Sequence, residues 1–418
     1  MSASPPGPPS AGGPPERPPG PHRPTPVAQR ALAPDLARGL MLLFIALVNV
    51  GHFLDQPYDA ETATGAADRA VTLVQAALVD RRAIPLFAFL FGYGTVQLLR
   101  RLDPRGEAWA GARRILRRRG MWMVLIGLVH GVLLLPVDII GTYGLTLLLF
   151  AGLLRARDRT LLAVGAGVIT AYAVLPLAWV LVSLAQGPGP GPQGEPALTA
   201  VAVAQRPEPV AALAEALAAN FTEWLLYTPV TMLMFVVPPA ALGVWAARRR
   251  VLEEPERHRA LLRGTAAGGL GLAVLAGLPH GLVGAGLLDT WVSTDALSLL
   301  QEFTGPLGGL GWAAVFGLAA GRVLERGAEP SGLTRAVAAT GQRSMTSYLL
   351  QSVVFTAVFS PFAGGLGGST GAAGAAAVAL LTWIATVVLS ELQRLTGHRG
   401  PAETLLRRLT YGERRRER

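Results

Sequence analysis

Long apolar segments separated by short basic connections are the feature that most constrains the fold of this chain. A bilayer core about 30 Å thick requires roughly 17 to 25 mainly apolar residues per crossing helix. Only 15% of the 418 residues are charged and 51% are hydrophobic, so lipid must cover much of the surface. The sequence therefore predicts an all-α, polytopic integral membrane bundle of about ten transmembrane helices, over residues 36–54, 83–99, 119–136, 138–154, 161–184, 224–246, 264–288, 303–321, 345–362 and 371–390.

The arginines separate between alternate connections. Cytoplasmic loops retain basic residues, and one set of connections, together with both tails, holds every arginine except Arg69, Arg81, Arg82 and Arg206. This predicts that both termini are cytoplasmic and that the protein crosses a bacterial cell membrane many times. The net charge of +10 lies in short clusters between apolar runs, so it indicates contact with membrane lipids and not with nucleic acid.

The tails and loops divide the chain further. Residues 1–30 are rich in proline and glycine and are predicted to be a disordered cytoplasmic tail, while 391–418 form a basic cytoplasmic tail. Between them, 31–390 form the transmembrane domain, with an extracytoplasmic loop over 185–222. We expect the helical pattern from Val210 to Trp224 in that loop to lie on the membrane surface.

Small residues and turn residues predict how some spans pack. The second apolar segment begins near Pro85 and can extend back into the acidic loop before it. Glycines recur at four-residue spacing, as the close packing of helices in lipid favours. They are Gly277 with Gly281 and Gly317 with Gly321.

Composition excludes several kinds of chemistry. Cysteine and lysine are both absent, which excludes disulfides, thiolate metal sites, cysteine nucleophiles, a Walker lysine and a lysine Schiff base. No metal-ligand spacing, phosphate-binding glycine loop, nucleophile elbow or haem motif is present. The sequence therefore predicts no metal and leaves the cofactor open.

Ionisable side chains inside the spans are the best functional candidates, because each costs at least about 2.5 kcal/mol in hydrocarbon. Asp35 and Arg38 share one face at the cytoplasmic start of the first helix. A local ion pair that anchors the helix start explains them equally well. Asn49 and His52 lie at the outer end of the same helix, where a histidine can simply be solvated.

A second group surrounds the predicted hairpin between the third and fourth segments. His130 lies in the outer half of the third segment, Asp138 follows Pro136 in the turn, and Tyr143 begins the fourth. We expect imidazole, carboxylate and phenol to converge there, as in general-base chemistry. A buried hydrogen-bonded lock on the hairpin is the equal alternative. His280 in the seventh segment is interpreted as a packing residue.

Polar groups also gather at the start of the ninth segment. They are Ser347, Tyr348, Gln351 and Ser352, and the basic residues Arg113 to Arg119, Arg407 and Arg408 belong to the same predicted cytoplasmic side. Together they predict a positive inner face that can hold anionic lipid headgroups or a phosphorylated cofactor. Topogenic charge alone explains most of these arginines.

Five stretches spread over nearly the whole chain form a joint pattern. They read RALAPDLARGLMLLFIALVNV, PLFAFLFGYG, RRRGMWMVLIGLVHGVLLLPVDIIGTYGL, GQRSMTSYLLQS and GPAETLLRRLTYG. In this order they resemble the domain-of-unknown-function 418 family, the YeiB-like bacterial membrane proteins. Pro34, Ser347 and Leu406 depart from the residues that are usual at those positions.

A more distant resemblance concerns function. The chain is similar to the transmembrane acyltransferase superfamily in three features. They are the D-x-x-R-G motif that begins at Asp35, a first helix that ends in V-N, and the P-x-F-x-F-L-F-G run that follows. That likeness implies transfer of an acyl group from a cytoplasmic donor, for instance acyl-CoA, to an extracytoplasmic acceptor. Asn49 stands where the sugar O-acetyltransferases commonly have histidine, so the base would be His130 or His52.

The leading hypothesis is thus an acyltransferase-like enzyme whose acceptor is a glycan, a lipid or a small molecule. Its catalytic candidates are His130, Asp138, Asp35 and Arg38, and its substrate-binding candidates are Asn49, His52, Tyr143, Tyr348 and Gln351. A transporter or export component, in which His130 or Asp138 carries a proton, is the alternative from another class. A noncatalytic membrane scaffold is the third.

Overall fold

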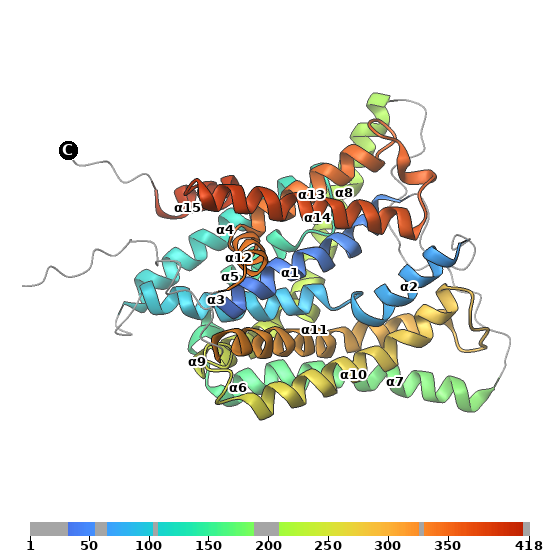
Figure 1. Cartoon of the computed structure of the whole chain (residues 1–418), viewed down its shortest axis with the longest axis horizontal. Helices are drawn as coiled ribbons and strands as arrows, with labels where there is room; N and C mark the ends of the chain where they lie inside the picture. Colours follow the sequence, from blue (N-terminus) through green and yellow to red (C-terminus); the bar gives the residue numbers. More distant parts are fainter. Residues whose placement is uncertain (1–31, 55–64, 103–107, 188–208, 326–329, 413–418) are drawn as a thin grey trace, which may run out of the picture. The chain divides into compact units, whose positions relative to one another are not determined.

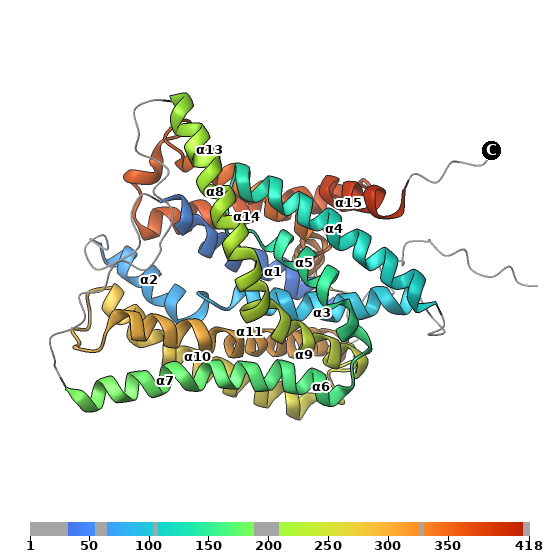
Figure 2. The same cartoon turned by 180° about the vertical axis from the view of Figure 1, so that it is seen from behind.

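The computed structural model describes residues 32–54, 65–102, 108–187, 209–325 and 330–412. The chain divides into Met1–Arg30 and Ala31–Arg418, and all of the described residues belong to the second unit. The tail predicted over residues 1–30 and the last residues of the basic C-terminal tail lie outside the described residues. Figures 1 and 2 show the chain from opposite sides.

Every regular element in the described ranges is helical, so the all-α prediction is confirmed. Short 3-10 or π turns, η2 to η6, join or interrupt the α-helices. The α-helices are α1 (Leu32–Asn49), α2 (Ala66–Leu78), α3 (Ala83–Leu102), α4 (Trp109–Leu133), α5 (Ile139–Phe150), α6 (Asp158–Leu162), α7 (Val168–Gln186), α8 (Pro209–Thr231), α9 (Val237–Arg248), α10 (Arg259–Gly284), α11 (Thr294–Glu325), α12 (Gly332–Gln342), α13 (Ser344–Phe359), α14 (Ala372–Leu395) and α15 (Pro401–Tyr411).

Within the residues that the structure describes, seven helical stretches are long and apolar enough to cross a membrane. They are Leu32–Phe53, Ala66–Leu102, Asp158–Ala185, Ala214–Arg248, Arg259–Gly284, Thr294–Val323 and Ala372–Leu395. The predicted segments 138–154 and 345–362 correspond to the shorter apolar helices Ile139–Arg155 and Ser344–Phe359. The predicted segment 119–136 lies in α4, whose first half carries the arginine cluster. The chain therefore has the helices of a multi-pass membrane protein.

Large apolar side chains on the outer helices point away from the protein. Leu175 on α7 is 68% exposed and Leu381 on α14 is 65% exposed, and both helices carry several more exposed leucines and valines. A water-soluble bundle would bury such side chains, whereas lipid favours them at the surface. The faces of α7 and α14 are consequently the ones we assign to lipid.

The described end of the predicted 185–222 loop, from residue 209 onward, is part of a long helix and not a separate surface segment. The Val210–Trp224 pattern, expected to lie on the membrane surface, is the first part of α8. It continues through the π turn η5 (Met232–Val236) and α9 to Arg248. A run of alanine and leucine keeps α8 unbroken, Pro229 precedes the π turn, and Pro238 and Pro239 stand in the first turn of α9, where proline is tolerated. This region thus enters the bundle directly.

The second apolar segment does extend back, but as a separate helix. After α2 the chain makes a turn at Arg81, whose φ of 63° is left-handed, and α3 follows. The glycine pair of α10 packs on α2, since a Cβ at Gly277 would lie 2.4 Å from the carbonyl oxygen of Ala76. Close packing at Gly277 and Gly281 is thus confirmed.

The centre of the bundle is α1. It packs against α3, α11, α12, α13 and α14, while α10, α11 and α7 lie side by side at one edge. Gly39 of α1 makes the closest of these approaches possible, because a Cβ there would lie 2.0 Å from the carbonyl oxygen of Val337 in α12. This arrangement brings the predicted site residues of α1, α4 and α13 to neighbouring helices.

Candidate functional site

The α4–α5 hairpin closes as its short connection predicts. Asp138 is the N-cap of α5 and accepts hydrogen bonds from the backbone N–H groups of Ile140 (3.2 Å) and Gly141 (2.5 Å). Its carboxylate also reaches across to α4, where a Cβ at Gly127 would lie 2.2 Å from Oδ2. Glycine at position 127 therefore lets the capping carboxylate lie against the facing helix.

His130 of α4 meets this carboxylate. Its Nδ1 lies 3.0 Å from Asp138 Oδ1, although the two groups lack the alignment of a linear hydrogen bond. The side chains are 1% and 0% exposed, so water does not compete for either group. The predicted meeting of imidazole and carboxylate is confirmed.

The other face of the imidazole contacts α13. His130 Nε2 lies 2.9 Å from the hydroxyl oxygen of Ser352, which is 1% exposed. With Asp138 on the Nδ1 side, we assign the ring hydrogen to Nδ1, so that Nε2 accepts the hydrogen bond from Ser352. Carboxylate, imidazole and hydroxyl thus form one continuous buried line, which we call the Asp138–His130–Ser352 relay.

Among the described residues Tyr143 has no hydrogen bond to His130, although its phenol interacts electrostatically with Asp138. Its hydroxyl donates to the carbonyl oxygen of Ile84 at 3.3 Å, and its ring stacks on Phe91 with centroids 4.9 Å apart. The phenol points toward α3 because its position on α5 faces that helix. Tyr348 of α13 takes the expected place, with its ring 5.0 Å from the imidazole.

Gln351 ties α13 to the central helix. Its Nε2 donates to the carbonyl oxygen of Leu42 in α1 at 3.2 Å, while its Oε1 is buried with no hydrogen-bond partner among the described residues. Ser352, the next residue, bonds His130 of α4. Two adjacent side chains of α13 therefore reach two different helices, α1 and α4.

Trp224 of α8 covers the hairpin beside the relay. A Cβ at Gly131 would lie 2.2 Å from its Cδ1 atom, and one at Gly141 would lie 2.9 Å from its ring. The indole Nε1–H is buried and finds no acceptor in the described part of the chain. A buried donor without a partner marks a place where a ligand or water oxygen is needed.

At the opposite end of α1, the predicted ion pair is confirmed. Arg38 Nη1 lies 3.1 Å from Asp35 Oδ1, and Arg38 Nη2 donates to the carbonyl oxygen of Leu90 in α3 at 3.1 Å. The second oxygen of Asp35 accepts from Gln342 Nε2 in α12 at 3.0 Å. Arg119 of α4 interacts electrostatically with Glu403 of α15 and with Arg38, so two guanidinium groups and two carboxylates gather at this end. The pair thus holds three helices together as well as lining the inner end.

Asn49 and His52 lie at the far end of α1. Asn49 is its last residue and His52 belongs to the 3-10 turn η2 (Val50–Phe53), where it is half-buried and interacts electrostatically with Arg81. Within the described ranges no hydrogen bond joins either side chain to His130. Of the two histidines proposed as the base, His130 is the one with a described carboxylate against its ring.

Sequence reasoning missed the partners that come from distant parts of the chain. Ser352 was noted only as a polar residue, yet it bonds a histidine 222 positions away. Trp224 carried no signal beyond its place in a helical pattern. Among the residues that the structure describes, no group of three His, Asp or Glu side chains is arranged to hold a metal ion.

A polar line buried between apolar helices defines the class: an all-α protein with the helices of a multi-pass membrane protein and a carboxylate, an imidazole and a hydroxyl in contact inside its bundle. Residues 246–413 match the family model "Protein of unknown function (DUF418)". The matched range includes Ser352 but not His130 or Asp138. The resemblance to the DUF418 family noted in the sequence is therefore confirmed over these residues.

Two relatives match along nearly the whole chain. The uncharacterized protein YxaH of Bacillus subtilis (strain 168) is 25% identical over 418 residues, which cover 93% of this chain and 96% of YxaH. The uncharacterized protein YeiB of Escherichia coli (strain K12) is 26% identical over 407 residues, 91% of this chain and 96% of YeiB. No solved structure gives a significant match.

Proposed function

We propose that this protein is a membrane acyltransferase in which the Asp138–His130–Ser352 relay carries the acyl group. The observation that supports this is the position of the imidazole, with Nδ1 3.0 Å from a carboxylate oxygen and Nε2 2.9 Å from a serine hydroxyl. A nucleophile bonded to a base that a carboxylate orients is the arrangement by which hydroxyl groups attack acyl donors.

The proposed first step forms an ester on Ser352. His130 Nε2 takes the hydroxyl proton while Oγ attacks the carbonyl carbon of a thioester, the carbon–sulfur bond breaks, and the departing sulfur takes the proton from His130. Asp138 stabilises the imidazolium that exists between these events. The indole N–H of Trp224 is a free donor for the oxygen that becomes negative.

The second step returns the site to its starting state. An acceptor hydroxyl or amine gives its proton to His130 and attacks the ester carbonyl, and Ser352 leaves with that proton. A glycan, a lipid or a small molecule can serve as acceptor. Since Ser352 is the ninth residue of the 16-residue helix α13, the ester would lie near the middle of the span, within reach of either side.

The proposal places the donor at the end of α1 that carries Asp35 and Arg38. Arg38 is held by Asp35 and interacts with Arg119, and a thioester such as acyl-CoA carries phosphates that guanidinium groups bind. We further propose that ten helices cross the cell membrane with both termini in the cytoplasm, which puts this end inside. The arginine distribution supports that orientation.

Acyl capture by Ser352 is the direct test. Purified protein in nanodiscs is incubated with labelled acetyl-CoA, denatured and digested, and we expect the label on the peptide that contains Ser352. Ser352→Ala should take up no label, and His130→Ala should lower the acylation rate about a hundredfold or more.

Ser347→Ala is the matched control, because Ser347 is equally buried on the same helix and makes no contact with His130. It should acylate at the rate of the parent protein. Unchanged turnover in His130→Ala would remove the proposed base, and label that persists in Ser352→Ala would remove the proposed ester.

A proton-coupled transporter is the second candidate. It is favoured by one observation, the burial of an ionisable pair at 1% and 0% exposure inside an apolar bundle, as proton relays in membranes require. Proteoliposomes that move a substrate without changing it covalently, and that stop in His130→Ala, would favour transport over acyl transfer.

A further inference from the structure

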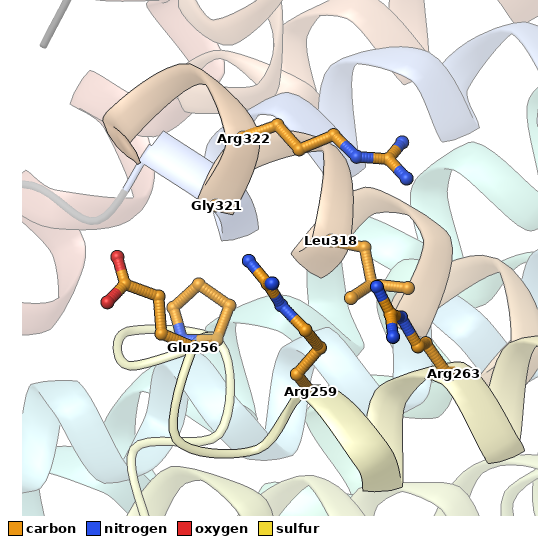
Figure 3. Close-up of a pocket in the computed structure, with 7 residues that line it drawn as sticks. Glu256, Arg259, Arg263, Leu318, Gly321 and Arg322 are labelled. Carbon is orange, nitrogen blue, oxygen red and sulfur yellow. The ribbon is translucent and has the colours of Figure 1, made fainter. Parts of the chain in front are cut away.

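A small basic pocket lies between α10 and α11, apart from the relay. It encloses about 140 Å³. Figure 3 shows Arg259 and Arg263 rising from the first turns of α10, Arg322 facing them from α11, and Leu318 among the three guanidinium groups. Glu256 is the one carboxylate in its lining, so the pocket has a strong positive excess.

Such an arrangement attracts anions. Like charges brought together in a concave site repel each other, and the low-dielectric walls strengthen the repulsion. Within the part of the chain that the structure describes, no carboxylate lies within ion-pair distance of Arg263 or Arg322. Both guanidinium groups therefore retain donors for a ligand.

The start of α10 adds to the positive field. Arg259 is the first residue of this 26-residue helix, and the N-cap residue, His258, makes no side-chain capping bond. The N–H groups of a first turn and the helix dipole both favour a negative group at this end. Arginine side chains and helix start thus converge on one small volume.

The depth of the pocket indicates the kind of anion. It lies at the beginning of the apolar stretch Arg259–Gly284 and at the end of Thr294–Val323, two adjacent stretches. Ends of spans lie where lipid phosphates lie. Leu318 and Gly321 give the pocket an apolar floor next to its charges, as a lipid headgroup with its glycerol requires.

We propose that this pocket binds a phosphate group, and that its occupant is the headgroup of an anionic phospholipid. Arg263 and Arg322 hold the phosphate oxygens, Arg259 and the start of α10 complete the positive field, and the acyl chains lie along the exposed apolar surface of the spans. This site does not depend on the acyl-transfer proposal, since none of its residues belongs to the relay.

Lipid retention measures the site directly. The protein is purified in nanodiscs that contain phosphatidylglycerol and phosphatidylcholine, and native mass spectrometry counts the lipids that remain bound. We expect the parent protein to retain phosphatidylglycerol selectively. Arg263→Gln/Arg322→Gln should lose about tenfold or more of that retention, because two charge-assisted contacts are removed.

Arg157→Gln/Arg159→Gln is the matched control, since it removes two exposed arginines at the start of α6 outside the pocket and should retain the lipid like the parent protein. Equal retention in the pocket variant and this control would overturn the proposal. If the glutamine pair does not fold, Arg263→Lys/Arg322→Lys keeps the charge but loses the planar fork. That pair should bind several-fold more weakly, and retention at the parent level would overturn the site.

A last experiment tests whether the bound phosphate group belongs to a lipid or to a soluble compound. Inorganic phosphate at millimolar concentration should neither displace phosphatidylglycerol nor raise the melting temperature in phosphatidylcholine alone. Displacement that depends on Arg263 and Arg322 would overturn the lipid assignment and make the occupant a soluble phosphate compound.

Discussion

At the scale of single residues, Asp138 combines two roles that usually belong to different side chains. It caps α5 through two backbone N–H groups and also faces the imidazole of His130. The pair could be predicted from sequence because the two residues are only eight positions apart on either side of a tight turn. Ser352 and Trp224 could not, since their contacts depend on how α13 and α8 pack against the hairpin.

The two roles of Asp138 can be separated by substitution. Asparagine has one acceptor oxygen where the aspartate uses two, so Asp138→Asn keeps one of the two cap hydrogen bonds and should lose less stability than Asp138→Ala. Asp138→Asn also removes the charge that stabilises the imidazolium, so acylation of Ser352 should fall at least about a hundredfold. Thermal melts and labelling rates measure the two effects on one sample.

Asp138→Ala is the companion variant, and it should lose stability as well, by roughly 0.5 to 2 kcal/mol for the cap alone. If Asp138→Asn keeps full activity, the carboxylate is only a structural cap and the relay is not a catalytic group.

Trp224 provides a second test at this scale. Trp224→Phe keeps most of the packing against Gly131 and Gly141 but removes the buried N–H. Loss of one donor to a developing oxyanion typically lowers the catalytic constant about a hundredfold or more. We expect a fall of that order without a change in donor affinity, and an unchanged rate would exclude Trp224 from the reaction.

At the scale of elements, backbone contact between helices decides the packing. Gly243 of α9 lies so close to α3 that a Cβ would be 2.0 Å from the carbonyl oxygen of Phe89, and Gly92 of α3 approaches α9 in the same way. Helix positions could be predicted from apolar length, but these partners could not, because glycine in a span does not indicate which neighbour it faces. The continuous run from Pro209 to Arg248 was underestimated for a similar reason, since apolar length alone did not show where α8 begins.

Gly243→Ala is expected to destabilise the protein by about 1 to 3 kcal/mol, because the added methyl group must push two backbones apart. Gly271→Ala on α10 is the control, since nothing lies within 4 Å of its Cβ position. It should be neutral or slightly stabilising, as alanine is preferred to glycine within a helix. Thermal melts in detergent compare the two, and equal effects would contradict the α3–α9 packing.

The C-terminal helix explains one of the sequence motifs. Glu403 of α15 accepts from the backbone N–H groups of Met345 (2.8 Å) and Thr346 (3.1 Å) and from the Thr346 hydroxyl (2.5 Å). It thereby supplies the start of α13 with the acceptor that its own N-cap, Arg343, does not provide. The tail motif is therefore part of the helix that carries Ser352.

Glu403→Ala should release α15 from α13 and cost about 1 to 3 kcal/mol, the range for leaving buried donors without partners. Limited proteolysis should then cut after α14 faster than in the parent protein. Arg408→Gln on the exposed side of α15 is the control and should be cut at the parental rate. Equal cutting of both variants would mean that Glu403 does not hold the helix.

At the scale of the whole molecule, the side of the membrane on which each helix end lies determines what can reach the relay. The chain contains no cysteine, so single cysteines give labelling without background. Ala67 on α2 and Arg114 on α4 are both exposed. A membrane-impermeant thiol reagent should label Ala67→Cys in intact cells and Arg114→Cys only after permeabilisation. The reverse pattern would invert the proposed orientation and the donor site with it.

The two ties of α13 have a consequence for how such a molecule would work. Gln351 holds the central helix while the neighbouring Ser352 holds His130, and an imidazole that has gained a second proton can no longer accept from a hydroxyl. When the ring charges, Nε2–H donates to the Ser352 oxygen instead, so this tie of α13 reverses its direction while the tie through Gln351 remains as it was. The Ser352 hydroxyl then points its own hydrogen away from the ring, so a single proton on His130 decides whether this oxygen can attack or only accept.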